Sequence, residues 1–240
     1  MSNIILVHGA WGGAWEFSDV VNLLSNDNKV TALDLPGHGK NTQPIANVTM
    51  AAYVKTVIDA INAQDEKVIL VGHSLAGAVI SQVAEEIPEK IDRLIYVAAV
   101  LPASGETALG LMQSDEHGQL LPNTIFSEDQ SYATVTEETV RTVLLNDIND
   151  QAHLDQLVPH FLFKQATEPF MAEAQLTEEK FGSVKKFYVR ASADKVLTPE
   201  LQSRMLNSWK MDKIFTLESG HFPLNSIPQA LVDVIHKASK

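Results

Sequence analysis

Short apolar runs recur along the chain and alternate with longer stretches in which apolar positions follow helical spacing. Uninterrupted short runs are typical of strands buried on both faces, and spacings of three and four residues are typical of helices that pack one face on a sheet. The strand candidates fall near residues 3–8, 29–34, 67–71, 92–99, 185–190 and 212–217, and the helical stretches near residues 15–25, 49–63, 75–86, 199–208 and 228–238. This alternation predicts an α/β fold with a mostly parallel six-stranded sheet covered by helices on both faces.

Residues 102–180 break the alternation. This stretch is too long for a loop, carries polar and acidic segments, and shows helical patterns around residues 137–145 and 151–157. We therefore predict one structural domain, in which residues 1–101 and 181–240 form the core and residues 102–180 form a helical cap insertion.

A turn between a predicted strand and a predicted helix carries the strongest chemical indication. Residues 68–71 predict the strand, residues 75–86 predict the helix, and the turn at residues 72–77 reads Gly-His-Ser-Leu-Ala-Gly. Such a turn lifts the Ser74 hydroxyl out of the sheet and places it beside the first helical N–H groups, so Ser74 is a candidate nucleophile. Glycine usually stands two residues after such a serine, and here Ala76 occupies that position. The turn alone is therefore also compatible with a plain structural loop.

His221 is the candidate base for Ser74. It follows an apolar run at residues 214–217, and a loop at the end of a strand is where a base is expected to lie. His236 lies inside the predicted last helix, where a cation suits the helix dipole. His117, His153 and His160 fall in mixed or polar surroundings of the cap.

Asp194 is the candidate acid. It follows the strand near residues 185–190 and precedes a helix that opens with Thr-Pro, so it can accept a hydrogen bond from the imidazole of His221. The alternative role for Asp194 is that of a turn residue. Asp92 and Asp212 stand at the beginnings of strands, at the opposite edge of the sheet.

The first strand runs directly into the segment His-Gly-Ala-Trp-Gly-Gly-Ala-Trp at residues 8–15. The turn at residues 72–77 resembles that of α/β-hydrolases, in which the loop after an early strand supplies one oxyanion-binding N–H and the residue after the nucleophile supplies the other. We therefore expect the backbone N–H groups of Ala10 and Leu75 to form an oxyanion hole. For His8 we favour a structural role through a backbone hydrogen bond.

These segments resemble the α/β-hydrolase superfamily, and within it the small plant-type methylesterases and hydroxynitrile lyases with their bacterial esterase relatives. The resemblance is carried by residues 7–15, 30–35, 72–75, 181–188, 194–195 and 220–221. It implies an α/β-hydrolase fold, a triad of Ser74, His221 and Asp194, small esters with compact or aromatic acyl groups as substrates, and no cofactor.

The lyase branch of that subfamily carries threonine directly after the histidine of the first loop and lysine directly after the triad histidine. Here those positions hold Gly9 and Phe222. The resemblance therefore favours a serine esterase over cyanohydrin cleavage. Lactone, thioester or peracid chemistry, weak lyase activity, and slow turnover by a small-molecule-binding protein remain alternatives on the same triad.

Aromatic side chains and one leucine are the candidate substrate contacts. The expected set is Trp11, His73, Phe126, Phe161, Phe163 and Phe222, with Leu144 and Phe170 as further pocket candidates. Those in the cap could equally form its own core.

Composition and charge argue against several classes of function. The hydrophobic content of 45% suffices for one substantial core, and a formal charge of −12, from 30 acidic and 18 basic residues, argues against binding of nucleic acid or anionic membranes. The eight histidines show no metal-ligand spacing, so we expect no metal.

Cysteine is absent, and no apolar run has the length of a membrane span or the form of a signal peptide, so we expect a cytoplasmic protein. A homodimer is compatible with the sequence, which does not fix the oligomeric state.

Overall fold

A six-stranded parallel sheet forms the centre of the computed structural model, which describes residues 1–240. The strand order is β2-β1-β3-β4-β8-β9. The strands are β1 (Asn3–Val7), β2 (Lys29–Leu33), β3 (Val68–His73), β4 (Ile91–Val97), β8 (Lys185–Ala191) and β9 (Lys213–Leu217). All six lie close to their expected places, so the prediction of a parallel sheet is confirmed.

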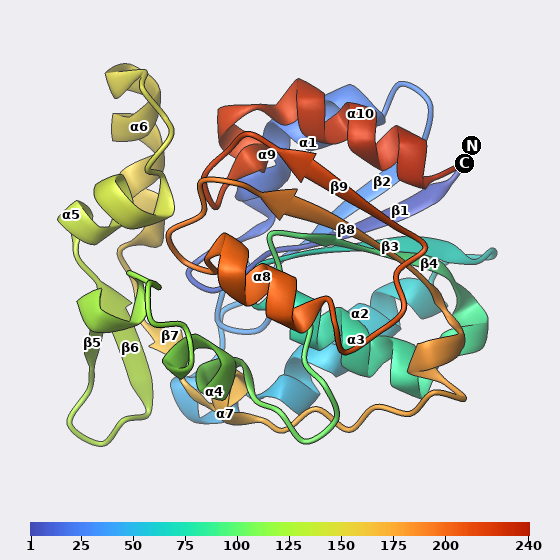
Figure 1. Cartoon of the computed structure of the whole chain (residues 1–240), viewed down its shortest axis with the longest axis horizontal. Helices are drawn as coiled ribbons and strands as arrows, with labels where there is room; N and C mark the ends of the chain where they lie inside the picture. Colours follow the sequence, from blue (N-terminus) through green and yellow to red (C-terminus); the bar gives the residue numbers. More distant parts are fainter.

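Helices cover both faces of this sheet. α1 (Ser18–Leu24) and α10 (Pro228–Ala238) lie on one face, and α2 (Met50–Asn62), α3 (Ala76–Glu86) and α8 (Pro199–Met205) lie on the other (Figure 1). The short helix α9 (Pro223–Ser226) precedes α10. The hydroxyl of Thr198 accepts from the backbone N–H of Leu201, and Pro199 follows at the first helical position, so α8 begins as its sequence predicts. None of the helices has the length and apolar composition required to cross a lipid bilayer.

Residues 102–180, called the insertion from here on, are not purely helical as expected. Their elements are α4 (Ala108–Gln113), β5 (Thr124–Phe126), β6 (Tyr132–Val135), α5 (Glu137–Thr139) continued by a π-helical turn (Val140–Leu144), α6 (Gln151–Leu157), β7 (Gln165–Ala166) and α7 (Glu168–Met171). The strands β5, β6 and β7 form a small antiparallel sheet. Strands of two to four residues are too short to show the alternation that identifies a strand in sequence.

The strand order places the candidate site residues at one edge. Ser74 follows β3, Asp194 follows β8 and His221 follows β9, and parallel strands end on the same side of a sheet. The insertion lies on the side toward which the arrowheads of β8 and β9 point (Figure 1). The fold therefore brings together residues that are separated by more than half of the chain.

Candidate active site

Ser74 lies in a strained turn between β3 and α3. Its φ angle is +53°, a left-handed conformation that non-glycine residues seldom adopt. The turn is fixed to the end of β4 and the segment after it, because Ser74 donates its N–H to the carbonyl of Val97 (3.3 Å) and its carbonyl accepts from the N–H of Val100 (2.9 Å). The Ser74 side chain is partly exposed, while its neighbours in the turn are buried.

The structure explains the alanine at the position where glycine is usual. A Cβ atom on Gly77 would overlap the carbonyl oxygen of Val100 and lie 2.9 Å from the Cβ of Ala99. The methyl group of Ala76 is itself buried without loss of the turn. The close contact that demands glycine therefore falls on Gly77, one residue later than the usual pattern.

Ser74, His221 and Asp194 form a continuous hydrogen-bonded line. The Ser74 hydroxyl lies 2.8 Å from Nε2 of His221, and Nδ1 of His221 lies 2.7 Å from Oδ2 of Asp194. A carboxylate accepts only, so Nδ1 donates to Asp194 and Nε2 is free to accept the Ser74 proton. His221 and Asp194 are both almost completely buried.

Asp194 also fills the turn role that was its alternative. Its Oδ1 atom accepts from the backbone N–H groups of Val196 (2.7 Å) and Leu197 (3.0 Å), while Oδ2 faces His221. One carboxylate thus shapes its own loop and orients the imidazole. The two interpretations of Asp194 are compatible.

The backbone N–H groups of Ala10 and Leu75 donate to no acceptor within the protein. Both belong to loops that approach each other closely, since a Cβ atom on Gly9 would lie 2.6 Å from the Cβ of Ser74. Two unpaired donors beside a partly exposed serine are suited to receive an oxyanion.

The insertion holds the loop that contains Ala10. Gln165 of β7 accepts the N–H of Trp11 (3.0 Å), and the indole N–H of Trp11 donates to the carbonyl of Ala133 (3.3 Å). Trp11 has a φ angle of +53°, so its backbone is strained as that of Ser74 is. Gln165 is fully buried, and no sequence pattern pointed to it.

His8 has the structural role that was favoured for it. Its Nδ1 donates to the carbonyl of Gly9 (2.7 Å), and its Nε2 accepts the N–H of Leu35 (3.0 Å). Burial lowers the pKa of His8 well below the ordinary value, and the neighbouring His38 ring lowers it further. A neutral ring is also what the hydrogen bond from Leu35 requires.

The expectation that His73 contacts substrate is corrected by its surroundings. The ring is fully buried, its Nε2 donates to the carbonyl of His221 (2.9 Å), and its Nδ1 lies 3.2 Å from Oε1 of Glu16. Both ring nitrogens are thus engaged by protein atoms. His73 supports the backbone of His221 from within the core, a contact that the sequence did not reveal.

Three further candidate contacts also lie away from the cavity described below. The rings of Phe161 and Phe222 meet edge to face at 5.2 Å, and Phe222 packs on His73 at 4.5 Å. Phe163 meets the ring of His38 at 5.3 Å. These aromatic residues fill the space between insertion and core, which is why they do not line the cavity.

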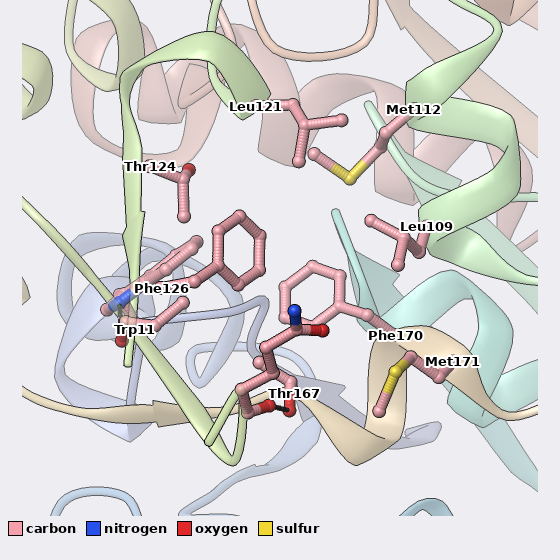
Figure 2. Close-up of a pocket in the computed structure, with 11 residues that line it drawn as sticks. Trp11, Leu109, Met112, Leu121, Thr124, Phe126, Thr167, Phe170 and Met171 are labelled. Atoms are coloured by element: carbon pink, nitrogen blue, oxygen red, sulfur yellow. Dashed lines mark hydrogen bonds between the residues drawn. The ribbon is translucent and has the colours of Figure 1, made fainter. Parts of the chain in front are cut away.

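An apolar cavity is lined mostly by residues of the insertion, and the lining side chains surround a common space (Figure 2). Trp11, Phe126 and Phe170, three of the candidate substrate contacts, line this cavity. The remaining lining residues are Leu109, Met112, Leu121, Thr124, Gln130, Ala133, Thr167 and Met171. Ser74 is not among them. Trp11, next in the chain to Ala10, connects the cavity with the loop beside Ser74.

The comparisons with known proteins agree with this architecture. The sequence matches the alpha/beta hydrolase family over residues 4–234. It is 31% identical to putative methylesterase 11, chloroplastic, of Arabidopsis thaliana, over 96% of this chain and 62% of that protein. It is 29% identical to the alpha-hydroxynitrile lyase of Arabidopsis thaliana, over 96% of this chain and 94% of the lyase. The chain thus spans less than two thirds of the length of the methylesterase.

A solved structure is also similar over nearly its whole length. The pyrethroid hydrolase from Sphingobium faniae JZ-2 is 28% identical and superimposes with a TM-score of 0.87, over 98% of this chain and 96% of the hydrolase.

Proposed function

The chain belongs to the alpha/beta hydrolase family, and from this premise we propose that it hydrolyses carboxylic esters through an acyl-enzyme on Ser74. The observation that carries the proposal is the unbroken line of hydrogen bonds from Ser74 through His221 to Asp194. The relatives named as a methylesterase and a pyrethroid hydrolase support it.

In the proposed reaction, Nε2 of His221 takes the hydroxyl proton as Ser74 attacks the ester carbonyl. Asp194 stabilises the imidazolium that forms, and His221 then returns the proton to the departing alcohol. Water hydrolyses the acyl-enzyme by the same route. The N–H groups of Ala10 and Leu75 bind the oxyanion, and the loss of one such donor typically costs about 3–4 kcal/mol of transition-state stabilisation.

The cavity indicates which esters fit. Its lining is mostly apolar, and Met112 and Met171 are flexible side chains that adapt to different shapes. We infer that it receives an apolar acyl or alcohol group of a small ester, with Trp11 and Phe126 as contacts. Substitution of Phe126 by Ala is expected to raise KM for esters with a bulky apolar group. Ile125→Ala is the matched control, because the adjacent side chain points to the other face of β5 and lies outside the cavity.

The decisive test uses 4-nitrophenyl acetate and a serine-reactive phosphonate. We expect a burst of one 4-nitrophenol per chain and one covalent label on Ser74, both absent from Ser74→Ala. A protein that shows neither the burst nor the label would refute the acyl-enzyme. A protein that is labelled but scarcely turns over would instead be a slow-turnover binding protein.

Cyanohydrin cleavage is the second candidate, because one relative is a hydroxynitrile lyase. Two features argue against it here. A side chain at Gly9, where the lyase branch carries threonine, would press on Ser74, and Phe222 puts a buried apolar ring where that branch carries lysine. We therefore expect cyanide release from mandelonitrile to stay near the buffer rate while 4-nitrophenol is released from the ester.

A further inference from the structure

Two polar residues of the insertion reach both loops that carry the partners of Ser74. Asn146 and Asp147 follow the π-helical turn Val140–Leu144 after one intervening residue, Leu145. The amide of Asn146 donates to the carbonyl of Ala193 (3.2 Å), and Oδ2 of Asp147 accepts the N–H of Gly220 (2.7 Å). Ala193 immediately precedes Asp194, and Gly220 immediately precedes His221. One dipeptide therefore holds the residues next to the acid and next to the base.

Gly220 leaves just enough room for this contact. A Cβ atom on Gly220 would overlap Oδ1 of Asn146 and lie 2.7 Å from Oδ1 of Asp147. The φ angle of Gly220 lies outside the left-handed region, so its backbone would accept an alanine without strain. The glycine is thus needed for the approach of the insertion and not for the shape of its own loop.

The contact is polar although it is partly buried. Oδ1 of Asn146 and Oδ1 of Asp147 are both buried without a hydrogen-bond partner. Buried polar atoms without partners destabilise a protein, so an apolar contact would hold the insertion more strongly. The polar pair instead orients the two loops, because each hydrogen bond fixes one backbone group of a loop.

The two loops are also connected to each other and to the insertion at further points. Ala193 donates its N–H to the carbonyl of Ser219 (2.9 Å), and the ammonium of Lys195 donates to the carbonyl of Thr142 (3.0 Å). A displacement of Gly220 therefore also moves the loop of Asp194.

We propose that Asn146 and Asp147 are positioning residues that hold His221 and Asp194 in the geometry required to activate Ser74. The proposal rests on the proposed ester hydrolysis for its kinetic readout, but the geometry itself can be observed without turnover. It assigns to the insertion a part in the chemistry, in addition to forming the cavity.

The first test is substitution of Asp147. Displacement of the reacting groups by about 1 Å can cost about 100-fold in rate, so we expect Asp147→Ala to lower kcat for 4-nitrophenyl acetate by about 10- to 100-fold with KM nearly unchanged. Asp147→Asn keeps an oxygen that can accept the N–H of Gly220 and should restore most of the activity. Asp150→Ala is the matched control, since it removes the same charge and the cap of α6 but touches neither loop.

The second readout is the low-field proton resonance of Nδ1–H of His221, which reports on its hydrogen bond to Asp194. We expect this resonance to broaden or disappear in Asp147→Ala and to persist in Asp147→Asn and Asp150→Ala. Retention of both kcat and the resonance in Asp147→Ala would overturn the proposal, and so would equal losses in Asp150→Ala. A protein without ester turnover whose resonance still depends on Asp147 would refute the proposed function alone.

The third test changes Gly220, the residue that Asn146 and Asp147 contact. Gly220→Ala should lower kcat in the natural sequence and add little to a variant that already carries Asn146→Ala and Asp147→Ala, because the overlapping oxygens are then gone. Independent, additive losses would show that Gly220 serves its own loop and would overturn the proposal.

Discussion

The turn of Ser74 and the two loops of Asp194 and His221 reach the same site by different means. The turn of Ser74 is held by the strands and helix that flank it: Ser74 bonds to Val97 and Val100, and Gly77 packs against Val100. The loops of Asp194 and His221 are held partly by the core, where His73 donates to the carbonyl of His221. They are held partly by the insertion, through Asn146, Asp147 and the carbonyl of Thr142.

The parts of the candidate site therefore depend on different segments of the chain. Ser74 is fixed by residues close to it in sequence or by the neighbouring strand of the sheet. Asp194 and His221 depend in addition on a segment of about eighty residues that docks from outside the sheet. We expect changes near Ser74 to act locally, and changes at the insertion to alter the site without touching a reacting atom.

The largest effect is expected from the hydroxyl itself. Removal of the nucleophile from a serine triad costs about six orders of magnitude in kcat, and Ser74→Ala should reach this scale in ester hydrolysis. Its thermal transition should barely change, because alanine keeps the Cβ atom and the strained φ angle. Ser74→Gly is the sharper control, since it should be equally inactive but more stable by about 1 kcal/mol. Substantial activity in either variant would point to another nucleophile.

The next largest effect concerns the acid. Asp194→Asn should favour the wrong tautomer of His221 and lower kcat by about four orders of magnitude. Asp212→Asn is the comparison, because Asp212 accepts the N–H of Lys186 near the opposite ends of the strands. A mild Asp194→Asn with a severe Asp212→Asn would reverse the assignment.

Two substitutions, Gly77→Ala and Ala76→Gly, test whether the turn of Ser74 is held by its close contact with Val100. Gly77→Ala forces a methyl group into the carbonyl of Val100 and should lower the free energy of unfolding by about 3 kcal/mol, at the upper end of overpacking effects. Ala76→Gly makes no clash and should cost at most about 1 kcal/mol. Denaturant titrations of both variants measure the difference. Equal losses in the free energy of unfolding would mean that the contact which requires glycine does not lie at Gly77.

The dependence on the insertion is tested at Gln165. Gln165→Leu leaves the N–H of Trp11 without its acceptor in a buried place, which should cost about 1–3 kcal/mol of stability and weaken ester turnover. Gln151→Leu, at an exposed position of the same insertion, should change the free energy of unfolding by less than about 0.5 kcal/mol. An unaffected Gln165→Leu would mean that the loop of Ala10 holds its shape alone.

The last effect is a pH dependence of stability that arises from His8, and it requires no change to the site. Its pKa is lowered in the folded state by burial and by the nearby His38 and His73, so the unfolded state binds the proton more readily. The stability from the neutral ring is therefore complete above about pH 6.5 and is lost as pH falls below it, by up to about 1.4 kcal/mol per pH unit. Denaturant titrations from pH 7.5 to 5.0 should show this slope, and His8→Asn should flatten it. An unchanged slope in the variant would assign the effect to other groups.

Contiguous patterns in the sequence determined the sheet, the turn of Ser74 and the loops of Asp194 and His221. Buried strands and amphipathic helices have periods that a short window reveals, and side chains at the carboxyl ends of parallel strands must share one edge. Even the unusual Ala76 was visible, although its consequence became clear only when Gly77 was seen against Val100.

The tertiary structure alone decided what surrounds those residues. It buried His73 and Phe222, gave the insertion a small sheet, and brought Gln165 to Trp11. It also placed Asn146 and Asp147 beside loops that lie between about forty-five and seventy-five residues further along the chain. Such contacts depend on how the insertion docks on the core, and a single hydrogen bond between distant segments leaves no period or spacing in the sequence.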